Sequence, residues 1–178
     1  LEMICQNGKI GLRRFAREDI EAFAKGVRRS KDSKNELSGM LRKISSLYQQ
    51  FEKDGFFSRE KGKLLIVLDQ GEIIGYCSYF KSSPYVNGYE IGYQIFQEDH
   101  RGKGYGTQAV RLFTDFLFEL QPILRIQICM DEQNHASERV AEKAGFSYEG
   151  IMRSVFQNKE RIVNNKVFSI IRKEWEAR

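Results

Sequence analysis

The segment Arg101-Gly102-Lys103-Gly104-Tyr105-Gly106-Thr107 has the residue types and spacing to bind a phosphorylated ligand. Its glycines allow the main chain to turn tightly and to approach a ligand closely. A helix that begins here would offer unpaired N–H groups and the positive end of its dipole to phosphate oxygens. Arg101 and Lys103 add positive charge. We therefore expect this glycine loop, residues 101–107, to bind a pyrophosphate.

Two common phosphate-binding motifs do not fit this loop. A P-loop requires GxxxxGK followed by Ser or Thr, whereas Gly104 follows Gly102-Lys103. A dinucleotide-binding GxGxxG motif requires a third glycine, whereas position 107 is Thr. The structural alternative is a flexible glycine turn that only caps a helix.

The elements around the loop follow from the hydrophobic pattern, in which a period of two predicts strands and steps of three and four predict helices. The predicted order is strand, two helices, three strands, helix, strand, helix and two strands. These elements cover Lys9–Phe15, a helix from Arg17, Leu37 to about Gly55, Leu64–Leu68, Ile73–Phe80, Tyr89–Phe96, Gly104–Leu120, Leu124–Met130, Asn134–Ala144, Phe146–Phe156 and Ile162–Arg172. The order predicts one α/β (α+β) domain, residues 3–178, with helices packed on a mixed sheet.

Three motifs together resemble one protein family. Arg101-x-x-Gly104-x-Gly106 resembles the Q/R-x-x-G-x-G/A motif of the GNAT acetyltransferase superfamily. Glu90-Ile91-Gly92-Tyr93 before it, and Asn134-x-x-Ser137-x-x-Val140-x-x-Lys143-x-Gly145-Phe146-x-x-Glu149-Gly150 after it, are similar to the Rim-type branch, the ribosomal-protein and related N-acetyltransferases. The resemblance runs from about Lys9 to Trp175 and includes a closing strand with Glu174-Trp175.

Two segments depart from the family pattern. Gln97-Glu98-Asp99-His100 lacks the proline that is common before this loop, and Asn164-Asn165 stands where an Asp is common. The second departure concerns the acceptor site. Neither departure affects the expected coenzyme binding. The fold that the resemblance implies is a mostly antiparallel, twisted GNAT-like sheet flanked by helices.

The resemblance implies that acetyl-CoA binds with its pyrophosphate on the glycine loop and that its acetyl group moves to a primary amine. The residues expected to hold it are Ile95, Phe96, Arg101, Gly102, Lys103, Gly104, Tyr105, Gly106, Thr107, Asn134 and Ser137. The main-chain N–H groups of Ile95 and Phe96 would face the developing oxyanion.

The resemblance also suggests the catalytic groups. A cationic amine must lose a proton before it attacks, and Glu90 is the candidate base, acting through a water; a solvated strand carboxylate is the alternative. Ser137 would stabilise the departing thiolate, and Asn134 would orient the pantetheine arm. The structural alternative is that Asn134 only caps a helix and that Ser137 faces solvent. Tyr148 ranks below Ser137 for the thiolate.

Composition narrows the class of protein. A net charge of +5 and a pI near 9.1 suit a phosphate-rich ligand or a nucleic acid. The sequence contains no recognised nucleic-acid module, so a nucleic-acid partner is not expected. Three separated cysteines favour neither disulfides nor zinc, and His100 and His135 lack partners at ligand spacing, so no metal is expected. No membrane-spanning run or signal peptide is recognisable, and a cytoplasmic protein is expected.

The acceptor and the assembly stay open at this stage. A protein N-terminal amine is favoured, because a polyamine enzyme would be expected to line its site with acidic residues. Polyamine, aminoglycoside and amino-sugar acceptors, a non-catalytic acyl-CoA-binding module, and a homodimer are the alternatives. The basic run Arg28-Arg29-Ser30-Lys31 is interpreted as a solvated helix end that could also face an acidic acceptor.

Overall fold

The computed structural model describes residues 3–30, 44–158 and 160–178. Its strands are β1 (Met3–Gln6), β2 (Ile10–Arg13), β3 (Lys61–Leu68), β4 (Ile73–Phe80), β5 (Gly88–Ile95), β6 (Arg125–Asp131), β7 (Ser147–Gln157) and β8 (Ile162–Ile171). Its helices are α1 (Asp19–Arg29), α3 (Ile44–Asp54), α4 (Tyr105–Leu120), α5 (His135–Lys143) and α6 (Arg172–Glu176), with a 3-10 turn, η2 (Glu98–His100). No helix in these ranges is long and apolar enough to cross a membrane.

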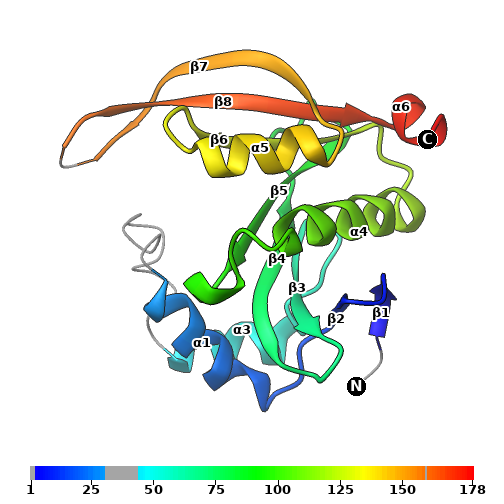
Figure 1. Ribbon diagram of the computed structural model, residues 1–178, viewed down its shortest axis with the longest axis vertical. Helices are drawn as coiled ribbons and strands as arrows, with labels where there is room; N and C mark the ends of the chain where they lie inside the picture. The colour runs from blue at the N-terminus through cyan, green and yellow to red at the C-terminus, as the bar shows by residue number, and fades with distance from the viewer. Residues whose placement is uncertain (1–2, 31–43, 159) are drawn as a thin grey trace.

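The strands form one sheet in the order β1-β2-β3-β4-β5-β6-β8-β7. Neighbouring strands are antiparallel except β5 and β6, which are parallel and are joined through α4. The predicted mixed, mostly antiparallel sheet is thereby confirmed. Figure 1 shows the β7–β8 hairpin (orange) extending past α5, with α1 and α3 at the opposite end of the molecule.

Successive side chains of β3 belong alternately to two cores, which explains why helices cover both faces of the first strands. Leu64 and Ile66 belong to a core shared with α4, whereas Leu65 and Val67 belong to a second core shared with α1 and α3. Successive side chains of a strand point to opposite faces, so a run of apolar residues indicates a strand buried on both sides. The sheet is therefore the middle layer in this region.

Strands β5 and β6 separate after a short stretch of pairing. Their registered pairs are Gly88–Arg125, Tyr89–Ile126 and Glu90–Gln127. Residues 91–95 of β5 and 128–131 of β6 continue without pairing to each other. We call this opening the fork.

Only alternate residues of β5 direct their main-chain hydrogen bonds toward β4, and this alternation determines which main-chain groups face the fork. The N–H of Phe96 donates to the carbonyl of Ile74 over 2.9 Å, on the β4 side. Antiparallel partners use the main-chain groups of alternate residues. The N–H and C=O groups of Tyr93 and Ile95 therefore face the fork.

Most predicted elements are present, with shifted ends. The helix predicted from Leu37 is confirmed over Ile44–Asp54, while residues 37–43 lie outside the described ranges. Strand β1 was not predicted. The expected closing strand with Glu174-Trp175 is wrong, because that segment forms α6: the Glu174 carboxylate accepts the Ile171 N–H at 3.1 Å, and Trp175 stacks on Phe118 of α4.

Candidate active site

A cavity of about 610 Å³ lies at the fork. It is lined by residues of β5, the glycine loop and α5, with one wall from α1 and β4. The lining residues are Val27, Tyr76, Ser78, Gly92, Tyr93, Gln94, Ile95, His100, Arg101, Gly102, Gly104, Gly106, Thr107, Asn134, Ala136, Ser137, Arg139, Val140 and Lys143. The fold thus brings together the three motifs that were noted separately in the sequence.

The glycine loop has the conformation that an anion cradle requires. Gly102 and Gly104 have φ values of 72° and 83°, in the left-handed region that favours glycine. Helix α4 begins directly afterwards, with Gly104 as its N-cap and no side chain capping it, so its first N–H groups remain available. Gly106 packs closely on Tyr93, since a Cβ there would lie 3.3 Å from the Tyr93 ring.

Five of the seven predicted loop residues line the cavity: Arg101, Gly102, Gly104, Gly106 and Thr107. Lys103 is exposed and Tyr105 half-buried, and neither belongs to the lining. The Arg101 guanidinium donates to the carbonyl of Ile95 and to the hydroxyl of Ser30, which sequence reasoning did not anticipate.

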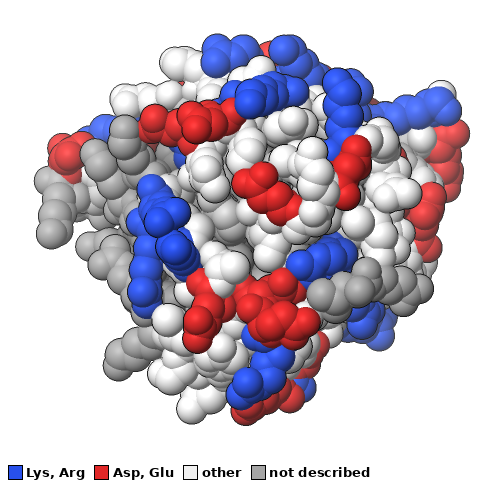
Figure 2. Space-filling model, turned by 60° about the horizontal axis from the view of Figure 1, so that its bottom comes forward, with Lys and Arg blue, Asp and Glu red and all other residues white. Residues whose placement is uncertain are grey.

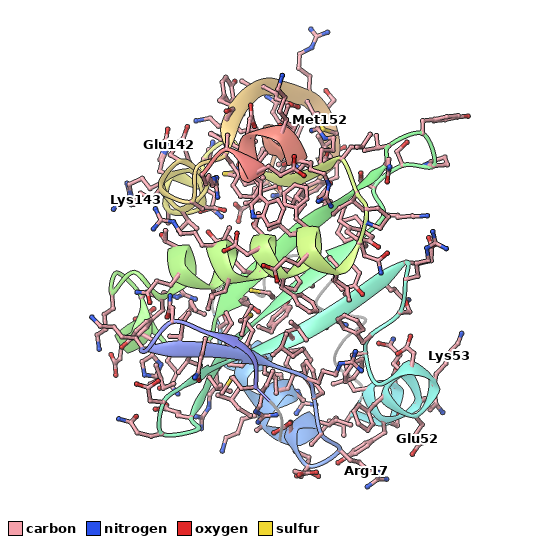
Figure 3. All side chains as sticks on the ribbon, turned by 90° about the vertical axis from the view of Figure 1, so that its right-hand side faces the viewer. Arg17, Glu52, Lys53, Glu142, Lys143 and Met152 are labelled. Carbon is pink, nitrogen blue, oxygen red and sulfur yellow. The ribbon has the colours of Figure 1, made fainter. Side chains whose placement is uncertain are left out.

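Two cations on α5 were missed as site residues. Arg139 and Lys143 are four residues apart, which places them on one face of the helix, and both line the cavity. Lys143 lies at the C-terminal end of α5 (Figure 3). Their spacing within the Asn134–Gly145 motif was the signal that could have identified them. With Arg101 they give the lining its positive charge.

Ser137 and Asn134 occupy the places that the sequence suggested. The Asn134 side-chain oxygen accepts the Ser137 N–H at 3.1 Å and caps α5, so the predicted capping is confirmed, and both residues line the cavity. The Tyr93 hydroxyl contacts the Ser137 Oγ at 3.2 Å. Burial raises the pKa of Tyr93 to about 12, against the opposing effect of the Ser137 hydrogen bond. No role was predicted for Tyr93.

Tyr148 lies elsewhere. Its side chain is 53% exposed, its ring packs on Phe168 with centroids 5.2 Å apart, and it does not line the cavity.

Glu90 stands at the base of the fork, where pairing between β5 and β6 ends. It is half-buried, and its carboxylate accepts a hydrogen bond from Gln127 Nε2 at 2.9 Å. Burial and the nearby Glu90 carboxylate raise the pKa of the Cys129 thiol to about 12, so this neighbour stays protonated. Glu90 does not line the cavity. Gly92, two residues further along β5 and on the same face of the sheet, does line it.

The two predicted oxyanion donors differ. Ile95 lines the cavity and its main chain faces the fork, as expected. The Phe96 N–H is already bonded to Ile74, and its side chain is buried in the α1–α3 core, so the expectation for Phe96 is wrong. The reason is that alternate N–H groups along β5 point toward β4, and the N–H of Phe96 is one of them.

The other charged side chains carry both signs, and a second cavity of about 680 Å³ includes Arg111, Asp115, Lys143, Glu176 and Arg178 in its lining. On the face drawn in Figure 2, blue and red side chains are scattered among white ones, and several lie next to a side chain of opposite charge. No group of three His, Cys, Asp or Glu side chains among the described residues is arranged to hold a metal ion. His100 lines the cavity near Glu72, at 3.8 Å, and the exposed His135 pairs with Glu138.

Comparisons with known proteins identify the family. A family model described as an acetyltransferase (GNAT) domain matches residues 9–147. The chain is 30% identical to YjcK of Bacillus subtilis, named as a probable N-acetyltransferase, over 86% of this chain and 81% of that protein.

Two solved structures share the fold. One is the spermidine N-acetyltransferase of Vibrio cholerae with CoA and spermine, at a TM-score of 0.82 and 17% identity, covering 96% of this chain and 99% of that one. The other is RimL, a ribosomal L7/L12 α-N-protein acetyltransferase with coenzyme A, at a TM-score of 0.82 and 19% identity, covering 97% and 99%. The chain therefore belongs to the GNAT acetyltransferase family and is an acetyl-CoA-dependent N-acetyltransferase.

Proposed function

We propose that the cavity at the fork is the active site, with acetyl-CoA held along α5 and the glycine loop and the amine entering along α1 and β4. One observation carries this proposal: the N-terminal end of α4, the unpaired main chain of β5 and Ser137 all border one cavity. The donor set fits the substrate, because phosphates match helix N–H groups and cations. Residues 3–178 would act as one domain.

Glu90 is the proposed base. A carboxylate at the base of the fork can take the proton of the acceptor amine through a water that bridges the distance to Gly92. The Gln127 hydrogen bond orients the carboxylate, and a carboxylate has further acceptor positions that can receive a hydrogen bond from that water. Acetyl-CoA supplies the thioester carbonyl that the neutral amine attacks.

Two further groups would respond to the charge that develops. The main-chain N–H groups of Ile95 and Tyr93 face the fork and are the proposed oxyanion donors. Ser137 is the proposed donor to the leaving thiolate, because its Oγ accepts from Tyr93 and its own hydrogen is left to point into the cavity.

For the acceptor, a protein N-terminal amine is favoured over a polyamine. The lining residues on the side of α1 and β4 are Val27, Tyr76 and Ser78, and together with Gln94 of β5 they are uncharged. Among the described lining residues there is no carboxylate, although a polycationic acceptor would gain from several. The spermine-bound Vibrio cholerae structure makes a polyamine the second candidate to test.

The first experiment measures thermal unfolding with acetyl-CoA. A ligand at 100 times its dissociation constant should stabilise the protein by about 2.7 kcal/mol. Gly104→Ala, which forces a side chain into a left-handed conformation, should reduce that shift, whereas Gly8→Ala, at a φ of 82° far from the cavity, controls for the strain itself.

The second experiment measures CoA release with peptide, polyamine, aminoglycoside and amino-sugar panels. Release with a peptide carrying a free α-amine, and none with the same peptide acetylated, would support the proposed acceptor. If CoA is released only with spermidine, the acceptor is a polyamine and the proposed protein N-terminal amine is wrong. Coenzyme binding with no turnover on any amine would instead indicate a non-catalytic acyl-CoA-binding module.

Two contextual proposals accompany this function. A cytoplasmic location suits the three unpaired cysteines, Cys5, Cys77 and Cys129. A homodimer is the assembly to test by light scattering, because edge strand β7 exposes Ile151, Met152 and Phe156.

A further inference from the structure

One buried hydroxyl joins three elements around the cavity. Ser30, only 2% exposed, ends α1 through a hydrogen bond from its N–H to the Gly26 carbonyl. Its Oγ accepts from Gln94 Nε2 on β5 at 3.0 Å and from Arg101 Nη2 on the glycine loop at 3.1 Å. We call Ser30, Gln94 and Arg101 the polar node.

Arg101 also holds the end of β5. Its Nε and Nη2 donate to the Ile95 carbonyl at 3.4 and 3.2 Å. Ile95 is the last residue of β5, and its main chain faces the fork. A guanidinium can donate to the Ile95 carbonyl and to the Ser30 hydroxyl at the same time, because its N–H donors are fixed in one plane. The ammonium of lysine is a compact point charge and cannot reproduce this geometry.

The last turn of α1 has a second contact with the same region. A Cβ on Gly26 would lie 2.4 Å from the Phe96 ring, so the helix packs on Phe96 as closely as glycine allows. Val27, between this contact and Ser30, lines the acceptor side of the cavity. The position of Val27 therefore depends on Phe96 at one end and on the polar node at the other.

We propose that Arg101 is a positioning residue: through Ser30 and Ile95 it fixes the acceptor wall and the end of β5 relative to the glycine loop, and so couples coenzyme binding to the order of α1. This deepens the proposed function and rests on it. The role differs from a direct phosphate contact, in which the charge of Arg101 would matter and its hydrogen-bond geometry would not.

Calorimetric titration with coenzyme A separates the two roles. Arg101→Lys and Arg101→Met should both raise the Kd by roughly 10-fold, because neither keeps both acceptors. Ser30→Ala should raise it by about 3-fold, and Arg101→Met combined with Ser30→Ala should be no worse than Arg101→Met alone, as expected for residues acting as one unit. Ser147→Ala, on the exposed start of β7, is the matched control.

Hydrogen exchange tests the coupling itself. Saturating coenzyme A should slow amide exchange at residues 27–30 in the wild type, and Ser30→Ala should lose this slowing while still binding coenzyme A. If Ser30→Ala does not fold, the Arg101→Lys and Arg101→Met pair decides alone.

Two results would overturn the inference: an affinity of Arg101→Lys close to that of the wild type beside a large loss in Arg101→Met, or equal slowing of exchange in Ser30→Ala and wild type. A wild-type protein that does not bind coenzyme A would overturn the proposed function as well, so the two failures are distinguishable.

Discussion

The hydroxyl of Tyr93 on β5 lies 3.2 Å from the Oγ of Ser137 on α5, and this contact joins the two elements at the cavity that both residues line. Since burial raises the pKa of Tyr93 to about 12, the phenol stays protonated and donates across the physiological range. Ser137 can then direct its own hydrogen into the cavity. The pair therefore orders the group that we assign to the leaving thiolate.

Replacing Ser137 tests that assignment. Ser137→Ala should lower kcat roughly 10- to 100-fold with little change in coenzyme affinity, because the lost donor acts on charge that develops during reaction. Tyr93→Phe should lower kcat less, and its pH–rate profile should match the wild type below about pH 10, where Tyr93 does not ionise. Tyr148→Phe, outside the cavity, is the control. A larger loss in Tyr148→Phe than in Ser137→Ala would reverse the two assignments.

Glu90→Gln keeps the shape of the side chain and removes the proposed base. Steady-state rates with an α-amine peptide should fall about 100-fold at pH 7 and by much less at pH 9, since an amine with a pKa near 8 is then already neutral. Glu160→Gln, on the exposed β7–β8 turn, provides a comparison of equal charge. An equal loss at both pH values would show that Glu90 positions groups without accepting a proton.

Gly26→Ala should destabilise the protein although alanine favours helices. The new Cβ would meet the Phe96 ring at 2.4 Å, and such overpacking costs about 1–3 kcal/mol. Urea unfolding measures the change, with Lys25→Ala on the exposed side of α1 as the control. An unchanged or raised midpoint for Gly26→Ala would mean that α1 does not pack on Phe96 in this way.

The buried pair Arg13–Asp19 predicts a pH-dependent contribution to stability. Burial acts to raise the pKa of Asp19, but hydrogen bonds from Arg13 and the Ala16 N–H outweigh it and lower the pKa below the ordinary 3.8. This stabilisation is therefore present above about pH 4 and is lost as pH falls through the lowered pKa.

Asp19→Asn should cost about 3–5 kcal/mol at pH 7, because it leaves the Arg13 charge buried without its partner. Urea unfolding from pH 7 to pH 2 should show the difference from wild type shrinking toward the acid end. The exposed pair Arg17–Glu52, at 3.8 Å (Figure 3), supplies the comparison, and Glu52→Gln should change stability by less than about 1 kcal/mol at any pH. A difference for Asp19→Asn that stays constant with pH would contradict this account.

Local patterns predicted the parts of the site that are local in the chain. The glycine loop, the start of α4 and the Asn134 cap depend on residues within one or two turns of each other, so their spacing was sufficient. Tyr93 could not be assigned a role in the same way, because its contact with Ser137 joins residues 44 positions apart in the chain. The prediction for Phe96 as an oxyanion donor was wrong, because the neighbouring strand determines which N–H groups are already hydrogen-bonded, and the sequence of one strand does not show this.

Tertiary contacts also decided the elements that the sequence missed or misread. Strand β1 has only four residues and gains its partner from β2, which leaves almost no periodic signal. The segment at Trp175 has residues compatible with a strand, but the indole donates to Asp115 and stacks on Phe118, which holds it over α4 as a helical turn. The hydrogen bonds of Arg101 to Ile95 and Ser30 were not anticipated either, because they join the glycine loop to β5 and to the residue that follows α1; its contact with phosphate stays a prediction.

Beyond their three registered pairs, β5 and β6 do not pair with each other, so each strand has an edge without a strand partner at the fork. The pantetheine arm of coenzyme A is an extended chain with amide groups of its own, and it can lie between them as a surrogate strand. Recognition of this kind draws on peptide groups that every residue carries. Side chains along the opening could then change during divergence while the coenzyme keeps its place, leaving the acceptor wall free to specialise.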